Sequence, residues 1–578
     1  MNNKEIAKTL NSLADLMELS GENPFRVRAY RRAARTIEMS RQSIETKQDQ
    51  LEEMNGIGKG MARVIREIME TGTTQLLEER KKALPPGLID LLQLPGVGPK
   101  TISKLYQQLN ITNLEELKQA IQRQELRSLK GFGVKKEQKI WNAIETYEQR
   151  PNRVLWPHAR ILAEKLMNRL HKLPSIEKVA LAGSLRRKKE TIKDIDYLAV
   201  TNDVQQAINE IQQIREVTEM LQTGESKVHF LAEWEEICLP VDVRFVPLAQ
   251  FGSALHHFTG SSEHNVRIRQ IGKKLGYKVN EYGIEDLATG KQYTFETETA
   301  FFQHLQLPYI APELREDRGE IETAQNNQLP NLVTQEMIKG DLHTHTLYSD
   351  GAHSIQEMAQ AAKEMGYQYL AITDHSRSLR VASGLTIEEL QQQWREIDQL
   401  NERFSDFHIL KGSEVDILPD GSLDYPDEIL SQLDLVIASI HTSFQLDQKT
   451  MTKRLIKAMK NPYVHIIGHP TGRLLLRREP YALDLEQIFQ VAQETGTILE
   501  LNANPRRLDL SDSLLKQAKE TYNLKFAINT DAHAVDQLSL ISYGIGTARR
   551  GWLEKEDVIN MHPWSTAKKW LKGHKKSL

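Results

Sequence analysis

The stretch Tyr369-Leu-Ala-Ile-Thr-Asp-His375 is a short apolar run that ends in residue types able to bind metal, and six related runs accompany it. The seven runs are GDLHTH (340–345), YLAITDH (369–375), HILKGSEVD (408–416), LVIASIH (435–441), VHIIGHP (464–470), TILELNAN (497–504) and KFAINTDAH (525–533). A helical stretch follows each run. Seven strand–helix units in succession predict a parallel, barrel-like sheet over residues 338–578.

Histidines and carboxylates are concentrated at the carboxyl ends of these runs, and residues 338–578 hold 11 of the 18 histidines. Strand ends of a β/α barrel cluster on one face, so we expect nine side chains to meet in one cleft. They are His343, His345, Asp350, His375, Glu414, His441, His469, Asp531 and His533. One such histidine alone would be a core or surface residue. The repetition favours a centre for Zn²⁺, Mn²⁺ or Fe²⁺ built from nitrogen and oxygen ligands.

A second group of carboxylates lies upstream, among short β-rich runs bounded by turns. Asp194 and Asp196 are two residues apart and so face the same side of a strand, which is costly unless a cation neutralises them. With Asp242 on a neighbouring strand, they could hold two Mg²⁺ or Mn²⁺ ions. Gly183 and Ser184 end the preceding strand and could contact phosphate. This spacing is typical of nucleotidyltransferases.

Residues 1–150 show helical periodicity interrupted by two glycine motifs, Met54–Gly60 and Leu94–Lys100. Each has the hydrophobic–X–Gly–hydrophobic–Gly core of a helix-hairpin-helix, whose backbone N–H groups bind DNA phosphates without reading sequence. A weaker third copy is Leu129–Lys135. The candidate DNA contacts are Gly56, Gly58, Gly60, Gly96, Gly98 and Lys100.

Composition narrows the class of protein. The chain has 578 residues, enough for several domains, with 39% hydrophobic and 26% charged residues, which argues against disorder or a fibre. No apolar run approaches the ~18 residues of a membrane helix. The lone Cys238 excludes an internal disulfide, and a net charge of −3 confines nucleic-acid binding to local patches. We expect a cytoplasmic protein without a membrane partner.

Together these motifs resemble the bacterial family X DNA polymerases of the PolX type, which carry a C-terminal PHP phosphoesterase domain, over essentially the full length. The resemblance implies a multidomain fold with an all-α helix-hairpin-helix region, an α/β nucleotidyltransferase palm, an α+β thumb-like subdomain and a distorted (β/α)7 PHP barrel. The implied boundaries are 1–90 and 91–150 for two hairpin domains, 151–250 for the palm, 251–318 for the nucleotide-selecting subdomain, 319–337 for a linker and 338–578 for the PHP domain.

The resemblance also assigns nucleotide contacts. HHFTGSSEHN (256–265) is similar to the family's nucleotide-binding segment. The implied contacts are Gly183, Ser184, Arg187, Arg244, His257, Phe258, Gly260 and Asn265. Two departures stand out: His257 replaces the usual tyrosine, so sugar discrimination can differ, and Val64 stands where eukaryotic members carry the lysine of a lyase. A Schiff base needs an amine, so lyase activity by that route is not expected.

For the PHP half, the resemblance implies up to three Mn²⁺ or Zn²⁺ ions. His343, His345, Glu414 and Asp531 would bind one; Glu414, His441 and His469 a second; and Asp350, His375 and His533 a third.

The implied function is a repair enzyme that fills short gaps in gapped or nicked DNA from dNTPs, as in base excision repair, using Mg²⁺ or Mn²⁺. The PHP domain would act as a 3′–5′ exonuclease or 3′-end processing enzyme, with abasic-site cleavage as an additional activity. We expect a monomer. Two alternatives stay open: a PHP half that is a small-molecule phosphatase, and a non-catalytic scaffold for DNA ends.

Overall fold

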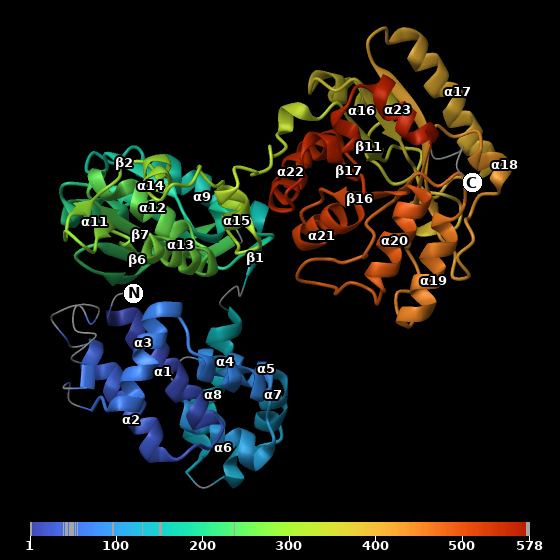
Figure 1. Ribbon diagram of the computed structural model, residues 1–578. Helices are drawn as coiled ribbons and strands as arrows, with labels where there is room; N and C mark the ends of the chain where they lie inside the picture. The colour runs from blue at the N-terminus through green and yellow to red at the C-terminus, as the bar shows by residue number, and fades with distance from the viewer. Residues whose placement is uncertain are drawn as a thin grey trace. The chain divides into compact units, whose positions relative to one another are not determined.

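The computed structural model describes residues 3–38, 40, 44, 51–52, 54, 56–94, 97–129, 131–149, 153–235 and 237–573 (Figure 1). Internal contacts divide the chain into two units. One contains residues 1–152 and 265–293, and the other contains residues 153–264 and 294–578. The boundary therefore falls inside helix α13 (Ser262–Lys274), between His264 and Asn265.

The first unit begins with a helical region built around one hydrophobic core. Its helices are α1 (Asn3–Leu19), α2 (Pro24–Glu38), α3 (Lys59–Thr71), α4 (Gln75–Ala83), α5 (Pro86–Asp90), α6 (Pro99–Leu109), α7 (Leu114–Gln122) and α8 (Val134–Gln149). In α1, Ile6, Leu10, Leu13 and Met17 follow the helical period and are fully buried. The core continues to Ile144, so the two expected hairpin domains share it.

The same unit holds a small antiparallel sheet of three strands. Their order is β10 (Gln292–Tyr293), β9 (Gly283–Asp286) and β8 (Tyr277–Asn280).

In the second unit, residues 153–246 form a five-stranded sheet. The strand order is β2 (Lys178–Leu181), β4 (Ile195–Val200), β7 (Ile237–Val246), β6 (Lys227–Trp234) and β5 (Val217–Thr223). Strands β4 and β7 are parallel, and the other neighbours are antiparallel. Side chains of β7 alternate: Val241 and Val243 are buried in the core, while Asp242 and Arg244 are half-buried.

Helices cover both faces of this sheet. The core that contains Val241 also takes side chains from α9 (Trp156–Leu170) and α11 (Val204–Gln212). On the other face, α12 (Phe251–Thr259) packs against Leu198 and Val200 of β4. The short helix α10 (Gly183–Arg186) follows β2, and two short strands, β1 (Val154–Leu155) and β3 (Thr191–Ile192), pair with each other. The expected α/β palm is therefore present.

The segment after this sheet is folded. It contains α14 (Glu298–His304) and, within the expected linker 319–337, α15 (Glu320–Gln325). Ile321 and Ala324 of α15 are buried, and Oε1 of Glu320 lies 2.8 Å from Nδ1 of His264. Apolar side chains three residues apart give this part of the expected linker a buried face, and that face is packed in the structure.

Residues 338–573 form the expected barrel. Seven parallel strands follow one another in sequence order: β11 (Gly340–Thr344), β12 (Tyr369–Ile372), β13 (His408–Asp416), β14 (Leu435–Ser439), β15 (Ile466–Ile467), β16 (Ile498–Asn502) and β17 (Phe526–Asn529). A bridge between Thr344 and Ala532 links the first strand to the segment after the last, so the sheet is nearly closed.

Helices surround this barrel (Figure 1). They are α16 (Ile355–Glu364), α17 (Ile387–Arg403), α18 (Asp427–Leu430), α19 (Gln448–Met459), α20 (Leu485–Thr495), α21 (Asp512–Tyr522), α22 (Ile541–Arg550) and α23 (Trp564–Gly573). The prediction of seven strand–helix units is thus confirmed. No helix within the described ranges is both long and apolar enough to span a bilayer.

Two candidate metal centres and a candidate DNA interface

The three palm carboxylates converge where β4 and β7 run side by side. Asp196 and Asp242 are direct neighbours in the register of these strands, and Asp194 immediately precedes β4. Burial and the charges of Asp194 and Asp242 raise the pKa of Asp196 to about 7, against the opposing effect of Arg244 and Arg187. Oxygen donors that repel one another in this way suit a hard divalent cation.

Gly183 packs directly against the carboxylate of Asp196, at a position where a residue with a side chain would not fit. Its φ is +64°, and an added Cβ would lie 1.9 Å from Oδ2 of Asp196. The glycine of the GS motif is therefore required by both backbone conformation and space. Ser184 follows it in α10.

His229 on β6 is a member of this site that sequence reasoning missed. It pairs with Asp242 in the strand register, and its Nδ1 lies 3.2 Å from Oδ2 of that residue. The sequence signal for His229 is the alternating pattern of β6. This pattern indicates which side of the strand His229 faces, but not which strand lies beside it.

The expected nucleotide contacts gather around the end of α12. The Arg244 guanidinium lies 4.3 Å from the centre of the Phe258 ring, which makes a T-shaped contact with His257. Gly260 ends the helix with a φ of +70°, and a Cβ there would lie 3.1 Å from Nη1 of Arg187. Asn265 lies on α13, in the other unit.

In the barrel, Glu414 occupies the centre of the second group. Its carboxylate lies 2.9 Å from Nδ1 of His375, 3.0 Å from Nε2 of His469 and 3.3 Å from Nε2 of His441. Nε2 of His343 and Nε2 of His345 lie 3.4 and 3.6 Å away. One carboxylate thus faces five imidazoles.

The remaining carboxylates complete the arrangement. Asp531 lies 3.2 Å from Nε2 of His345, and Asp350 lies 3.3 Å from Nε2 of His533 and 3.6 Å from Nε2 of His375. The structure therefore brings all nine expected side chains together. Three overlapping sets have ligand atoms within 4.8 Å of one another: His345, Asp350, His375 and His533; His343, His345 and Glu414; and His375, Glu414 and His441.

The chemistry of this donor set fits metal ions. Nε2 of His343 and both ring nitrogens of His345 are buried without a hydrogen-bond partner, although such atoms are normally satisfied. Burial lowers the pKa of His345 to about 3, with a further contribution from His375. A neutral imidazole with free lone pairs is the form that binds a metal.

Two residues that sequence reasoning missed orient the histidines. Nδ1 of His343 lies 2.7 Å from Oε1 of Glu500, whose Oε2 accepts the backbone N–H of His469 at 2.7 Å. Nδ1 of His441 lies 2.6 Å from Oδ1 of Asp416. Asp416 lies in HILKGSEVD, the run that carries Glu414, and Glu500 lies in TILELNAN, another of the seven apolar runs; these positions are the available sequence signal.

The hairpin glycines begin helices on an open surface. Gly58 and Gly98 precede the first residues of α3 and α6 in extended conformation, and a Cβ on either would meet nothing within 4 Å. Gly60 is similarly open, whereas Gly56, with a φ of +83°, packs against Arg32. Lys100 is exposed, and Gly96 lies outside the described residues.

A cavity of about 340 Å³ joins the second hairpin to the third. Val97 and Thr101 line it from one side, and Lys135, Lys136 and Lys139 from the other, with Ile140. After the first hairpin, Val64 of α3 is half-buried and packs against the hydrophobic core of the N-terminal helices. Three lysines, Lys135, Lys136 and Lys139, therefore cluster at the third hairpin, whereas Val64 occupies the position where related lyases carry a lysine.

Four family models match the chain. They are a helix-hairpin-helix domain over residues 1–74, a SAM-like helix-hairpin-helix tandem over 88–146, the DNA polymerase beta thumb over 254–316 and the PHP domain over 341–504. Each model falls where the structure places the corresponding feature: the glycine hairpins, the region around α12 and the barrel.

Curated relatives include proteins that match part of the chain and one that matches almost all of it. A probable phosphatase of Thermoanaerobacter sp. (strain X514) is 33% identical over 41% of this chain and 96% of its own length. Another, from Clostridium acetobutylicum, is 30% identical over 36% of this chain and 80% of its own length. The DNA polymerase/3′-5′ exonuclease PolX of Bacillus subtilis (strain 168) is 44% identical over 99% of this chain and 100% of its own length. With carboxylates on paired palm strands and a metal-type cluster in a seven-stranded barrel, this chain belongs to the PolX family of bacterial family X DNA polymerases with a C-terminal PHP domain.

Proposed function

We propose that this chain is a template-directed DNA polymerase that fills short gaps and also removes nucleotides from 3′ ends. The observation that carries the proposal is the presence of two separate metal-type groups in one chain: three carboxylates on paired palm strands, and nine ligand-type side chains that converge in the barrel. Full-length similarity to a protein named for both activities supports it.

In the palm, Asp194, Asp196 and Asp242 would hold two Mg²⁺ or Mn²⁺ ions. Bound there, such ions would favour attack by the primer 3′-hydroxyl and stabilise the leaving pyrophosphate. Gly183, Ser184, Arg187 and Arg244 would contact the phosphates of the dNTP. His257, Phe258, Gly260 and Asn265 would contact its sugar and base.

In the barrel, the nine ligands would hold up to three Mn²⁺ or Zn²⁺ ions, grouped around Glu414, Asp531 and Asp350. Bound ions would neutralise the scissile phosphate and supply the nucleophile for its hydrolysis. Glu500 and Asp416 would hold the rings of His343 and His441 in the orientation that binding requires. Cleavage at abasic sites is a further reaction that the same centre could carry out.

The hairpins would bind the DNA backbone on both sides of a gap, as repair by base excision requires. Gly58, Gly98 and Lys100 lie on open surfaces that a phosphate can approach, and the lysines of the cavity beside the third hairpin add positive charge. We propose the domain division 1–90, 91–150, 151–250, 251–318, 319–337 and 338–578, a monomeric state and a cytoplasmic location.

One gel assay tests both activities. A 5′-labelled primer in a one-nucleotide gap is incubated with Mn²⁺, with and without dNTPs, using the wild type, Asp196→Ala and His343→Ala. The primer should grow with dNTPs and shrink without them, and each variant should lose only one of these activities. A wild type that neither extends nor shortens the primer would favour a DNA-end scaffold.

A second candidate concerns the barrel alone. Two relatives described as probable phosphatases match less than half of this chain over 96% and 80% of their own length, and we take this to favour hydrolysis of small phosphate monoesters by the barrel. Comparing the rates on p-nitrophenyl phosphate and on labelled DNA separates the candidates. Faster turnover of the monoester, with intact DNA, would favour the phosphatase.

A further inference from the structure

Arg550, the last residue of α22 in the barrel, is a charged side chain with only 2% of its surface exposed. Its guanidinium donates hydrogen bonds to Oε1 of Glu316 at 2.9 Å and to Oδ2 of Asp512 at 2.7 Å. It also donates to the backbone carbonyl of Arg187 at 2.8 Å. A buried charge is stable only when it is paired and hydrogen-bonded, so these three contacts fix the side chain in one place.

Glu316 connects Arg550 to the polymerase site. Its Oε1 also accepts a hydrogen bond from Nε of Arg187 at 3.0 Å, and its Oε2 lies 3.2 Å from Nζ of Lys189. Burial would raise the pKa of Glu316, but the charges of Arg550, Arg187 and Lys189 outweigh it and lower the pKa to about 2. Arg187 additionally donates to the carbonyl of Thr259 at the end of α12. Arg550 thus holds both the carboxylate that orients the Arg187 side chain and the Arg187 backbone.

Helix α22 is packed tightly enough to hold Arg550 in register. A Cβ on Gly546 would lie 2.1 Å from Cη2 of Trp156 in the palm. A Cβ on Gly544 would lie 2.6 Å from Cγ2 of Ile528 and 2.7 Å from Cβ of Ala503, in the barrel. The two glycines let the helix lie between palm and barrel with no space for a side chain at either position.

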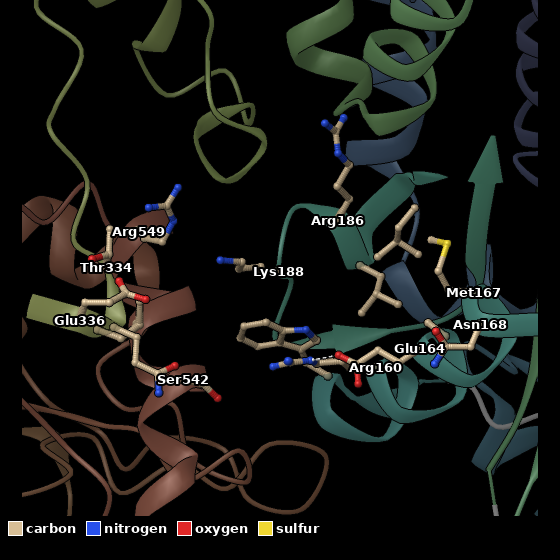
Figure 2. Close-up of a pocket in the computed structure, with 16 residues that line it drawn as sticks. Arg160, Glu164, Met167, Asn168, Arg186, Lys188, Thr334, Glu336, Ser542 and Arg549 are labelled. Atoms are coloured by element: carbon tan, nitrogen blue, oxygen red, sulfur yellow. Dashed lines mark hydrogen bonds and ion pairs between the residues drawn. The ribbon is translucent and has the colours of Figure 1, made fainter. Parts of the chain in front are cut away.

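Arg549 provides a natural comparison, because it is the neighbouring arginine on the same helix. It donates to Oε1 of Glu313 at 2.8 Å and to the carbonyl of Val333 at 3.0 Å, and Glu313 also pairs with Lys188 at 2.9 Å. Arg549 and Lys188 border a cavity of about 760 Å³ between palm and barrel, where Figure 2 shows Lys188 reaching from the palm toward the side that carries Arg549. Arg549 joins the same two parts of the chain through Glu313 and not through Glu316.

We propose that Arg550 is a positioning residue of the polymerase site: acting through Glu316, it sets the Arg187 guanidinium for the triphosphate of the incoming dNTP. The PHP barrel therefore completes the nucleotide site of the palm, in addition to carrying its own centre. This inference rests on the proposed function of Arg187 as a phosphate contact.

Steady-state gap filling by the full chain tests the inference, with Arg550→Gln, Arg549→Gln, Arg187→Gln and Glu316→Gln. We expect Arg550→Gln to raise the KM for dNTP about tenfold while kcat changes less than about twofold, because the contact orients the substrate. Arg549→Gln should leave the KM near the wild-type value. Combining Arg550→Gln with Glu316→Gln should raise the KM no further than Glu316→Gln alone, because both act on Arg187.

Exonuclease activity on single-stranded DNA serves as the check of folding. If Arg550→Gln lowers it, Arg550→Lys, which keeps the buried charge, replaces that variant and should show a smaller rise in KM. An unchanged KM in the Arg550 variants, or an equal rise in Arg549→Gln, would overturn the inference. Failure of the proposed function would look different: the wild type would not extend primers, or Arg187→Gln would leave the KM unchanged.

Discussion

In the palm, three carboxylates face one another across two strands, whereas in the barrel each carboxylate is surrounded by histidines. The palm arrangement raises the pKa of Asp196 to about 7, through burial and the charges of Asp194 and Asp242. In the barrel, imidazoles overcome the effect of burial and lower the pKa of Asp350 to about 2, and that of Glu414 well below its usual value. Conversely, despite burial, Glu414 and Asp416 raise the pKa of His441 to about 10.

The difference shows two ways of preparing a metal centre. The palm carboxylates carry unbalanced negative charge, so a cation relieves a strain that is already present. In the barrel, the raised pKa values of His441 and His533 favour protonated imidazoles beside the carboxylates, and a bound cation would replace those protons. A metal ion bound in the palm would therefore act by neutralising charge, and one bound in the barrel would exchange with protons.

The largest effect is expected from a substitution that disrupts the palm centre and leaves the barrel centre intact. Gly183→Ala would place a methyl group 1.9 Å from Oδ2 of Asp196 and must displace that carboxylate. We expect single-turnover gap filling to fall about a hundred- to a thousandfold, with exonuclease activity unchanged. Gly290→Ala is the matched control, because Gly290 also has a positive φ, +69°, but an added Cβ there meets nothing within 4 Å. Equal losses in both variants would show that backbone strain, and not overlap with Asp196, is responsible.

A smaller effect is expected from changing Glu500, which orients His343 in the barrel centre. Glu500→Gln keeps the shape of the side chain but removes the charge that orients His343. Metal affinity, measured by titration of the metal-free protein with Mn²⁺, should fall about 10- to 100-fold. Glu494→Gln on the exposed side of α20 should bind as the wild type does. Wild-type affinity in Glu500→Gln would mean that the strand alone orients the ring.

The pH dependence of metal binding should distinguish the two centres. Asp196, with a pKa of about 7, must lose its proton before it can bind, so Mg²⁺ affinity in the palm should fall as pH drops through 7 and level off above 8. His441 and His533, with pKa values of about 10 and 9, still hold protons at pH 8, so affinity in the barrel should keep rising there. Calorimetry in two buffers of different ionisation enthalpy counts the released protons. A palm affinity that is independent of pH in the wild type, as expected for Asp196→Asn, would contradict this account.

The smallest effect concerns stability without metal. The folded pKa of Asp196, about 7, lies above the ~3.9 of an unfolded aspartate, so Asp196 lowers the stability of the folded state progressively as pH rises from about 4 to 7. Asp196→Asn removes this penalty and should raise the Tm of the metal-free protein by about 2–4 °C at pH 8, and by less at pH 5.5. Adding Mg²⁺ should stabilise the wild type more than the variant. A lower Tm for Asp196→Asn at pH 8 would show that the carboxylate is compensated without metal.

Much of this fold follows from local pattern. A run such as YLAITDH indicates both a buried strand and the polar residue at its end. The order of the barrel strands and the convergence of the nine candidate ligands could therefore be predicted. The same holds for Asp194 and Asp196, whose spacing fixes a shared face. These features depend on neighbours in sequence or on a regular repeat.

What could not be predicted depends on partners distant in sequence. The pairing of His229 with Asp242 requires the order of strands in the sheet, and the contact of Glu500 with His343 joins residues 157 apart. Arg187 was expected at a phosphate, but its attachment through Glu316 to Arg550 spans two parts of the chain. The hydrophilic composition of the expected linker 319–337 does not reveal the helix α15 within it, because the buried residues of α15 occupy only one of its faces.

The palm core also contains side chains from the barrel, since Leu508 is buried in it and Leu475 and Tyr543 pack against it. These residues leave the ribosome only after the last palm strand, β7, which ends at Val246: Leu475 follows it by 229 positions (475 − 246) and Tyr543 by 297 (543 − 246). The N-terminal helices, whose core ends at Ile144, can complete their packing during synthesis. Until the barrel emerges, part of the apolar surface of the palm sheet stays uncovered, so we expect a chain stalled in the barrel to expose that surface to chaperones and proteases.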